Sequence, residues 1–185
     1  MPELRMARSS PLIPGGVRVR PLPPAARSSL RGGPEVREAA GAALGIALPV
    51  TACRAASAGE RAALWLGPDE WLLLAPEGEQ WSALRAALAQ LPHALVEVSH
   101  RQVALEVAGT DAPLLLAAGC PLDLEARAFP VGMCTRTVLA KAQVVLWRTA
   151  PERFRLEVWR SFALYVSDFL AEAQRGMDAP ATLPP

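Results

Sequence analysis

Residues 64–74 have the sequence Leu64-Trp65-Leu66-Gly67-Pro68-Asp69-Glu70-Trp71-Leu72-Leu73-Leu74, in which two apolar runs flank a turn. Gly67 and Pro68 interrupt the pattern, and the short runs suit strands better than helices, so the stretch predicts a β-hairpin. If Leu66 pairs with Trp71, alternation gives the hairpin two apolar faces. One face carries Leu64, Leu66, Trp71 and Leu73, and the other carries Trp65, Leu72 and Leu74. We therefore expect helices, a second sheet or another subunit to cover both sides of the hairpin.

The composition of the chain excludes several functional classes. A chain of 185 residues can bury a core in one domain or in two packed halves of about 80 residues each. The net charge of +1 gives no field that would attract nucleic acid or an anionic membrane. The cysteines, Cys53, Cys120 and Cys134, have no metal-binding spacing and are odd in number, which indicates free thiols in a reducing compartment. We expect a cytoplasmic protein without a zinc site or a membrane span.

Residues 1–33 differ from the rest of the chain. They contain six arginines, a single acid and several prolines, a composition typical of an extended or disordered arm. Such an arm can lie along a partner, and we expect its removal to leave the domain folded. Residues 34–175 are predicted to form a single globular α+β domain, and residues 176–185 a flexible tail.

The globular part contains an internal pseudo-repeat. Residues of about 34–92 and 103–174 follow one plan: a short helix ending in Gly, then a strand, a Pro-containing turn, a strand and an amphipathic helix. This plan predicts two packed halves of ferredoxin-like type with mainly antiparallel sheet.

The polar residues that attract attention fit structural roles better than catalytic ones. Ser99 and His100 are neighbours on an expected strand, where their side chains point to opposite faces and cannot act as nucleophile and base. Asp69 and Glu70 lie in a turn, and Cys120 follows a helix C-terminus, whose negative end raises a thiol pKa. The sequence contains no glycine-rich phosphate loop. We expect no catalytic, cofactor-binding or metal-binding residue in this chain.

A partner surface is the remaining candidate site. Trp159 alternates with Arg155 and Glu157 on the polar face of its strand, and Arg160 follows it; Trp and Arg are enriched at interface hot spots. The extended pattern around Pro21 and Leu22 adds a second stretch that can lie along a partner. The candidate interface residues are therefore Trp159, Arg160, Arg155, Pro21 and Leu22.

Four motifs, taken in order, closely resemble the gamma subunit of heterotetrameric sarcosine oxidase. They are Leu66-Gly67-Pro68-Asp69-Glu70-Trp71-Leu72-Leu73-Leu74, Val98-Ser99-His100-Arg101, Ala118-Gly119-Cys120-Pro121-Leu122-Asp123-Leu124 and Val158-Trp159-Arg160-Ser161-Phe162-Ala163. The likeness runs from about Arg18 to Ala173. More distantly, Leu105-Glu106-Val107-Ala108-Gly109 and residues 130–154 resemble the folate-binding first domain of the aminomethyltransferases of glycine cleavage.

The resemblance implies a complex of alpha, beta, gamma and delta subunits that oxidises sarcosine to glycine. FAD, FMN, NAD and zinc are then held by the other subunits, tetrahydrofolate accepts the one-carbon unit, and gamma is non-catalytic and contacts alpha. Where aminomethyltransferases carry an acidic pair near the folate pocket, this chain has Lys141-Ala142-Gln143. Two alternatives remain open: the equivalent subunit of a related dehydrogenase acting on an N-methyl amino acid such as N-methylglutamate, and a free-standing folate-binding protein.

Overall fold

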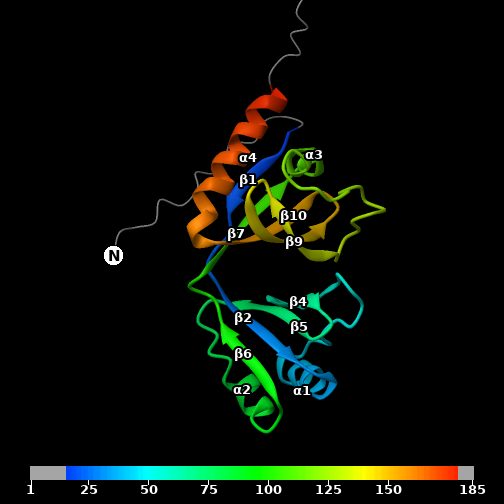
Figure 1. The fold of residues 1–185 in the computed structure, drawn as a ribbon, viewed down its shortest axis with the longest axis vertical. Coiled ribbons are helices and arrows are strands. Elements are labelled where there is room, and N and C mark those ends of the chain that lie inside the picture. The colour runs from blue at the N-terminus through cyan, green and yellow to red at the C-terminus, as the bar shows by residue number, and fades with distance from the viewer. Residues whose placement is uncertain (1–15, 179–185) are drawn as a thin grey trace, which may run out of the picture.

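The computed structural model describes residues 16–178, which form two five-stranded antiparallel sheets stacked face to face, with helices on the two outer faces (Figure 1). The α+β class with two packed, mainly antiparallel halves is therefore confirmed. No helix among residues 16–178 is both long and apolar enough to span a membrane.

The first half contains the sheet β3-β4-β5-β2-β6. Its elements are β2 (Ala25–Gly32), α1 (Pro34–Leu44), β3 (Ala55–Ala58), β4 (Arg61–Gly67), β5 (Glu70–Pro76), α2 (Ser82–Leu88) and β6 (His93–Glu97). Helix α1 has Pro34 in its first turn and ends at Gly45, whose φ of 69° closes the helix, as the sequence predicts. Residues 46–53, between α1 and β3, form an irregular connection.

The hairpin β4–β5 is confirmed, but its predicted register is wrong. Trp71 pairs with Trp65 rather than Leu66, because a bulge between Trp65 and Gly67 absorbs one residue. A shift of one residue moves the side chains of β4 to the opposite faces. Trp65 therefore lies with Trp71 on the helix side, while Leu64 and Leu72 lie between the sheets.

The second half contains the sheet β1-β7-β10-β9-β8. Its elements are β1 (Arg18–Pro21), β7 (Gln102–Ala108), α3 (Ala112–Ala117), β8 (Cys134–Leu139), β9 (Ala142–Ala150), β10 (Arg153–Trp159), a 3-10 turn η1 (Arg160–Phe162) and α4 (Ala163–Asp178). Helix α4 includes the first residues of the predicted tail at 176–185, and residues 179–185 lie outside the described part of the chain.

The two halves share one topology, with limits that differ from those of the expected repeat. β2, α1, β3, β4, β5 and α2 correspond in order to β7, α3, β8, β9, β10 and α4. The edge position of β6, beside β2, is taken in the second sheet by β1, beside β7. The chain therefore completes its second half with a strand from its own N-terminal part, and the repeats are not simply 34–92 and 103–174.

The prediction that residues 1–33 form an arm outside the globular domain is wrong for residues 16–33, which contribute two strands to the sheets. β1 pairs with β7, and β2 lies inside its sheet between β5 and β6. Val17, Val19, Ala26 and Leu30 are buried in the cores, although the surrounding arginines and prolines conceal this apolar pattern in the sequence. Residues 1–15 lie outside the described part of the chain.

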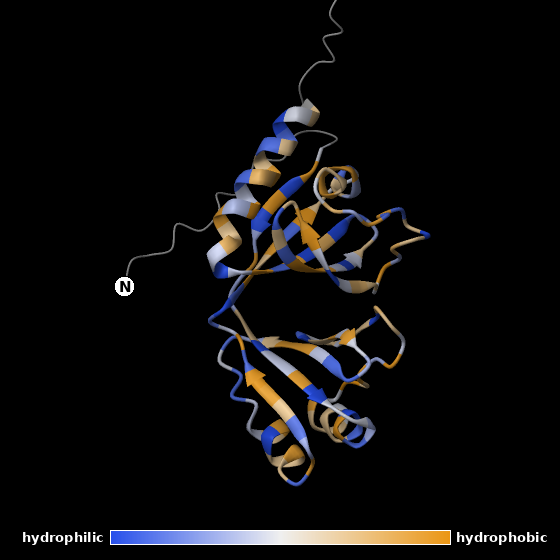
Figure 2. Ribbon diagram, viewed as in Figure 1, coloured by the Kyte–Doolittle hydropathy of each residue, from blue (hydrophilic) through white to orange (hydrophobic). Residues whose placement is uncertain are grey.

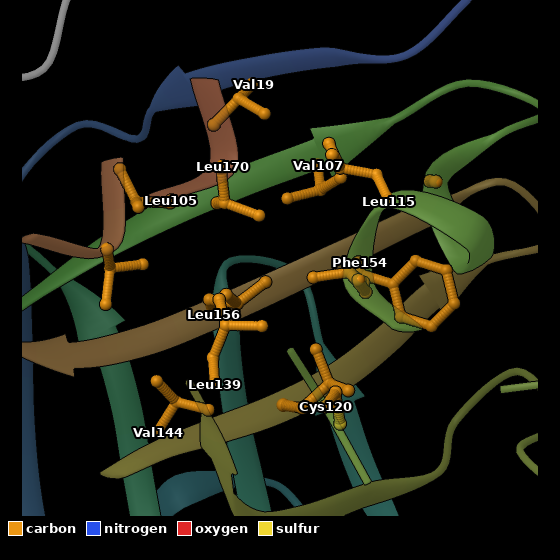
Figure 3. Packing of buried hydrophobic residues seen from close by; sticks show 14 of the residues in the cluster. Val19, Leu105, Val107, Leu115, Cys120, Leu139, Val144, Phe154, Leu156 and Leu170 are labelled. Atoms are coloured by element: carbon orange, nitrogen blue, oxygen red, sulfur yellow. The ribbon is translucent and has the colours of Figure 1, made fainter. Parts of the chain in front are cut away.

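Three apolar clusters hold these layers together, and Figure 2 shows hydrophobic residues in the strands of both sheets. One cluster packs α3 and α4 on the second sheet, with Val107, Leu115, Phe154, Leu156 and Leu170 among its members (Figure 3). Another packs α1 and α2 on the first sheet. The third lies between the sheets, where residues of β4 and β5 meet β8 and β9, so the hairpin is covered on both faces as expected.

Candidate functional site

A buried ion pair joins the two sheets beside the third apolar cluster. Arg27 on β2 donates from Nε to Glu157 Oε2 on β10 at 2.5 Å and from Nη2 to Oε1 at 3.5 Å. Arg155 also donates from Nε to Glu157 Oε1, at 2.7 Å. The Arg27 and Glu157 side chains are only 2% and 1% exposed. One carboxylate therefore binds two guanidinium groups, and the contact fixes β2 against β10.

This arrangement corrects the expected exposure of the polar row on β10. Phe154, Leu156 and Val158 are buried against the helices, so the predicted alternation is confirmed. The opposite face, with Arg155 and Glu157, meets the first sheet rather than solvent. Arg155 therefore makes its contacts mainly within the chain. The sequence of β10 does not indicate that a second sheet covers this face, so its burial could not be predicted.

Trp159 lies at the end of the same row, where the two sheets no longer cover it. Its side chain is 41% exposed, and the guanidinium carbon of Arg101 lies 4.9 Å from the ring centroid, in a cation–π contact. The backbone N–H of Arg160 donates to the Arg101 carbonyl at 2.8 Å. The segment 98–101, which carries the chain from the first half to the second, is thus held against the end of β10.

Ser99 and His100 lie in a turn of this crossing segment, not on the strand that the sequence predicts. The Ser99 hydroxyl accepts the backbone N–H of Arg27 at 2.9 Å and donates to Glu97 Oε1 at 3.2 Å. Its hydrogen bonds are therefore directed at β2 and Glu97 rather than at His100, whose side chain is exposed. This geometry fastens two neighbouring backbone segments together.

A cleft of about 460 Å³ opens where the two crossing segments, residues 22–24 and 98–101, pass between the halves. Pro21 and Leu22 line it together with Arg160, so the fold brings three of the five candidate interface residues to one place. Leu164 on α4 forms part of the same wall. Trp159 lines a smaller cleft of about 190 Å³, and Arg155 a third of about 510 Å³.

An exposed apolar surface borders the first cleft. It is formed by a single segment, η1 and the start of α4, together with the last residue of β10. Its members are Trp159, Phe162, Leu164 and Tyr165, which are all at least 39% exposed. Of the four, Leu164 lines the first cleft and Trp159 the second, and exposed large apolar side chains are candidates for contact with another protein. We call these four residues the apolar surface.

Two ionisable groups of the described chain have clearly shifted pKa values. Burial raises the pKa of the Cys134 thiol to about 12. The Glu79 carboxylate has a lowered pKa, first because it binds Arg61 and then because it accepts the backbone N–H of Trp81. Within residues 16–178, His, Cys, Asp and Glu side chains nowhere gather in groups of three or more that could hold a metal ion.

The inter-sheet contact of Arg27 and Glu157 is the main feature that reasoning from sequence did not find. Arg27 lies in the stretch interpreted as an arm, and Glu157 alternates with buried residues as a surface residue would. The alternation of Ala26, Ser28 and Leu30 around Arg27 was the one available signal of a strand.

Comparison with known proteins gives consistent matches along most of the chain. The model of the family "Sarcosine oxidase, gamma subunit family" matches residues 31–175. The sarcosine oxidase subunit gamma of Arthrobacter sp. is 39% identical over 75% of this chain and 70% of that protein. The subunit gamma of Corynebacterium sp. strain P-1 is 42% identical over 60% of this chain, and the match spans 56% of that protein.

Solved structures agree with the sequence matches. A chain of the heterotetrameric sarcosine oxidase from Corynebacterium sp. U-96, solved with pyrrole 2-carboxylate, superposes with a TM-score of 0.85 at 33% identity, covering 90% of this chain and 88% of that one. The glycine cleavage aminomethyltransferase T of Bartonella henselae superposes with a TM-score of 0.62 at 12% identity, covering 82% of this chain and 44% of that protein, which shows a shared fold. This chain belongs to the sarcosine oxidase gamma subunit family.

Proposed function

We propose that this chain is a non-catalytic subunit of a heterotetrameric complex that oxidises sarcosine to glycine, and that it acts by assembling with the larger alpha subunit. The observation that carries the proposal is the apolar surface beside a cleft to which the fold brings Pro21, Leu22 and Arg160. The family membership supports a role as one subunit among several.

The side chains that first suggest chemistry have structural partners. The Ser99 hydroxyl is bonded to Arg27 and Glu97, and Cys120 is buried in the apolar cluster beneath α3 and α4. We propose that FAD, FMN, NAD, zinc and the tetrahydrofolate acceptor are bound by other subunits. Replacing Ser99 or His100 by Ala then changes stability or assembly and leaves the chemical step intact.

Docking on the alpha subunit is tested with a pair of matched leucines. Leu164 on α4 belongs to the apolar surface and is 55% exposed, whereas Leu114 on α3 is 62% exposed and lies outside that surface. We expect Leu164→Ala to weaken capture of a co-expressed alpha subunit, while Leu114→Ala binds it as the unmodified chain does. Equal capture by both variants would contradict the proposed surface.

Two experiments separate the alternative functions. The purified complex is assayed with sarcosine and with N-methylglutamate, and peroxide release with sarcosine alone supports the oxidase. Calorimetry of the isolated chain with tetrahydrofolate tests the free-standing folate-binding protein, for which the 460 Å³ cleft and the aminomethyltransferase fold are the supporting observations. Micromolar binding, about 8 kcal/mol, would favour that alternative.

A further inference from the structure

Two of the three cysteines lie opposite each other where the two halves of the chain meet. Cys53 belongs to the connection between α1 and β3 in the first half, and Cys134 is the first residue of β8 in the second. The residues next to them, Arg54 and Met133, form an antiparallel bridge. The register of this bridge places Cys53 across from Cys134.

Hydrogen bonds fix this register on both sides of the bridge. The Cys134 N–H donates to the Cys53 carbonyl at 2.9 Å, and the Ala55 N–H donates to the Gly132 carbonyl at 2.8 Å. Residues opposite each other in an antiparallel pair have Cα atoms about 5.5 Å apart. Disulfides form at Cα separations of about 4.4–6.8 Å, a range that includes the typical spacing of such a pair.

Two further observations concern the conformation and the electrostatics of these cysteines. Cys53 has a φ of 59°, a left-handed backbone conformation that residues other than Gly rarely adopt. Burial is the main cause of the raised pKa of Cys134, and a smaller Coulombic interaction with Cys53 acts in the same direction. Cys120 lies in the other apolar cluster, beneath α3 and α4.

We propose that Cys53 and Cys134 form an oxidation-sensitive thiol pair that a peroxide converts into a disulfide between the two halves of the chain. Cys53, which is partly exposed, reacts first. Its thiolate forms a bond to one peroxide oxygen, the O–O bond breaks, and the departing hydroxide is protonated to water, leaving a sulfenic acid. The sulfur of Cys134 then bonds to the sulfur of Cys53, the S–O bond breaks, and the departing hydroxide takes the Cys134 proton as a second water.

In the overall reaction, two thiols and one molecule of hydrogen peroxide give one disulfide and two molecules of water. Peroxide is reduced and the two sulfurs are oxidised. Because burial keeps Cys134 protonated at neutral pH, the second step is the slow one and becomes faster as the pH rises. The bond links positions far apart in the sequence, and it should raise the melting temperature by about 5 °C or more.

The test uses the full chain, reduced and then exposed to hydrogen peroxide, with matched cysteine variants. We expect loss of two hydrogens from the intact mass, a Cys53–Cys134 peptide pair in a non-reducing digest, and reversal by dithiothreitol. Cys120→Ser, the control, forms the same bond, and Cys53→Ser forms none. Because Cys53 is partly exposed, Cys53→Ser should fold even if changes at buried Cys134 do not.

Oxidation of Cys53 to a sulfinic acid without any linked peptide would overturn the proposal, as would a bond that includes Cys120. The melting temperature gives an independent readout, since the oxidised chain should melt above the reduced one and the Cys53→Ser variant should show no such shift. The inference concerns this chain alone and does not depend on assembly with other subunits.

Discussion

Arg27 on β2 and Glu157 on β10 form a buried ion pair between the two sheets, with Nε and Oε2 2.5 Å apart. Arg27 also donates from Nη1 to the Ala25 carbonyl at 2.9 Å, and its backbone N–H binds Ser99. Arg27 is therefore bonded to β10 through its side chain and to the crossing segment 98–101 through its backbone. Removing Arg27 breaks the more buried of the two ion pairs at the Glu157 carboxylate, which then keeps Arg155 as a partner.

We predict that Arg27→Ala lowers the free energy of unfolding by about 3 kcal/mol or more. Arg31→Ala on the same strand is the control, because Arg31 and Asp69 form an ion pair whose side chains are 56% and 55% exposed. Its loss should cost less than about 1 kcal/mol. Denaturant unfolding of the isolated chain measures both values. Similar losses for the two variants would show that the buried pair is not a major contact between the sheets.

The raised pKa of Cys134 predicts a loss of stability at alkaline pH. The thiol ionises at about pH 9 in the unfolded chain but at about 12 in the folded chain, so the folded state holds the extra proton between these values. The contribution to stability is therefore fully present below pH 9 and decreases as the pH rises toward 12, by about 1.4 kcal/mol per unit.

Comparison of the unmodified chain with Cys134→Val isolates this effect. The difference in their free energies of unfolding should be constant from pH 7 to 8. Between pH 9 and 10 the unmodified chain should lose stability relative to the Cys134→Val variant. If the difference stays constant through pH 10, Cys134 is not the buried, protonated thiol described above.

Strands β1 and β2 predict that removing residues 1–33 prevents folding, whereas the composition alone suggests that the domain folds without them. A chain that begins at Pro34 lacks β1 and β2, and β2 is an inner strand of its sheet. We expect this truncated chain to lose cooperative thermal unfolding, measured by circular dichroism. A chain that begins at Gly16 keeps every described element and should fold. Cooperative melting of the Pro34 chain would show that β2 is dispensable.

Trp159 is predicted to act in the complex rather than in the fold. Because its ring is 41% exposed and contacts Arg101, Trp159→Ala should change the melting temperature of the isolated chain little. If the alpha subunit covers the ring, its loss weakens binding by about 2 kcal/mol. Melting and pull-down of the alpha subunit measure the two effects. A strongly destabilised isolated chain would instead make Trp159 a structural residue, and unchanged binding would make it a bystander.

Local signals in the sequence predicted many helices and strands. They failed where the structure depends on pairing between residues far apart in the chain. Gly45 marks the end of α1, and the hairpin around Gly67 and Pro68 is present, since both depend on neighbouring residues. The bulge beside Leu66 shifts the pairing by one residue and so reverses the faces of β4. Arg27 and Glu157 are 130 positions apart, and no local pattern shows that they meet.

The candidate interface was partly predictable for the same reason. Alternation along β10 correctly separated Trp159 from the buried residues Leu156 and Val158. It could not distinguish a face covered by a second sheet from one in solvent, so Arg155 was expected to be more accessible than it is. The meeting of Pro21 and Leu22 with Arg160 follows from strand β1, which the arginine-rich composition conceals.

The most direct test is to express the other three subunits with and without this chain, and to measure complex size and sarcosine-dependent peroxide release. We predict that the isolated chain has no turnover, that the complete complex is active, and that omission of this chain prevents stable assembly. Oxidation of sarcosine by the isolated chain, or a complex that assembles and turns over equally well without it, would contradict its role as a non-catalytic assembly subunit.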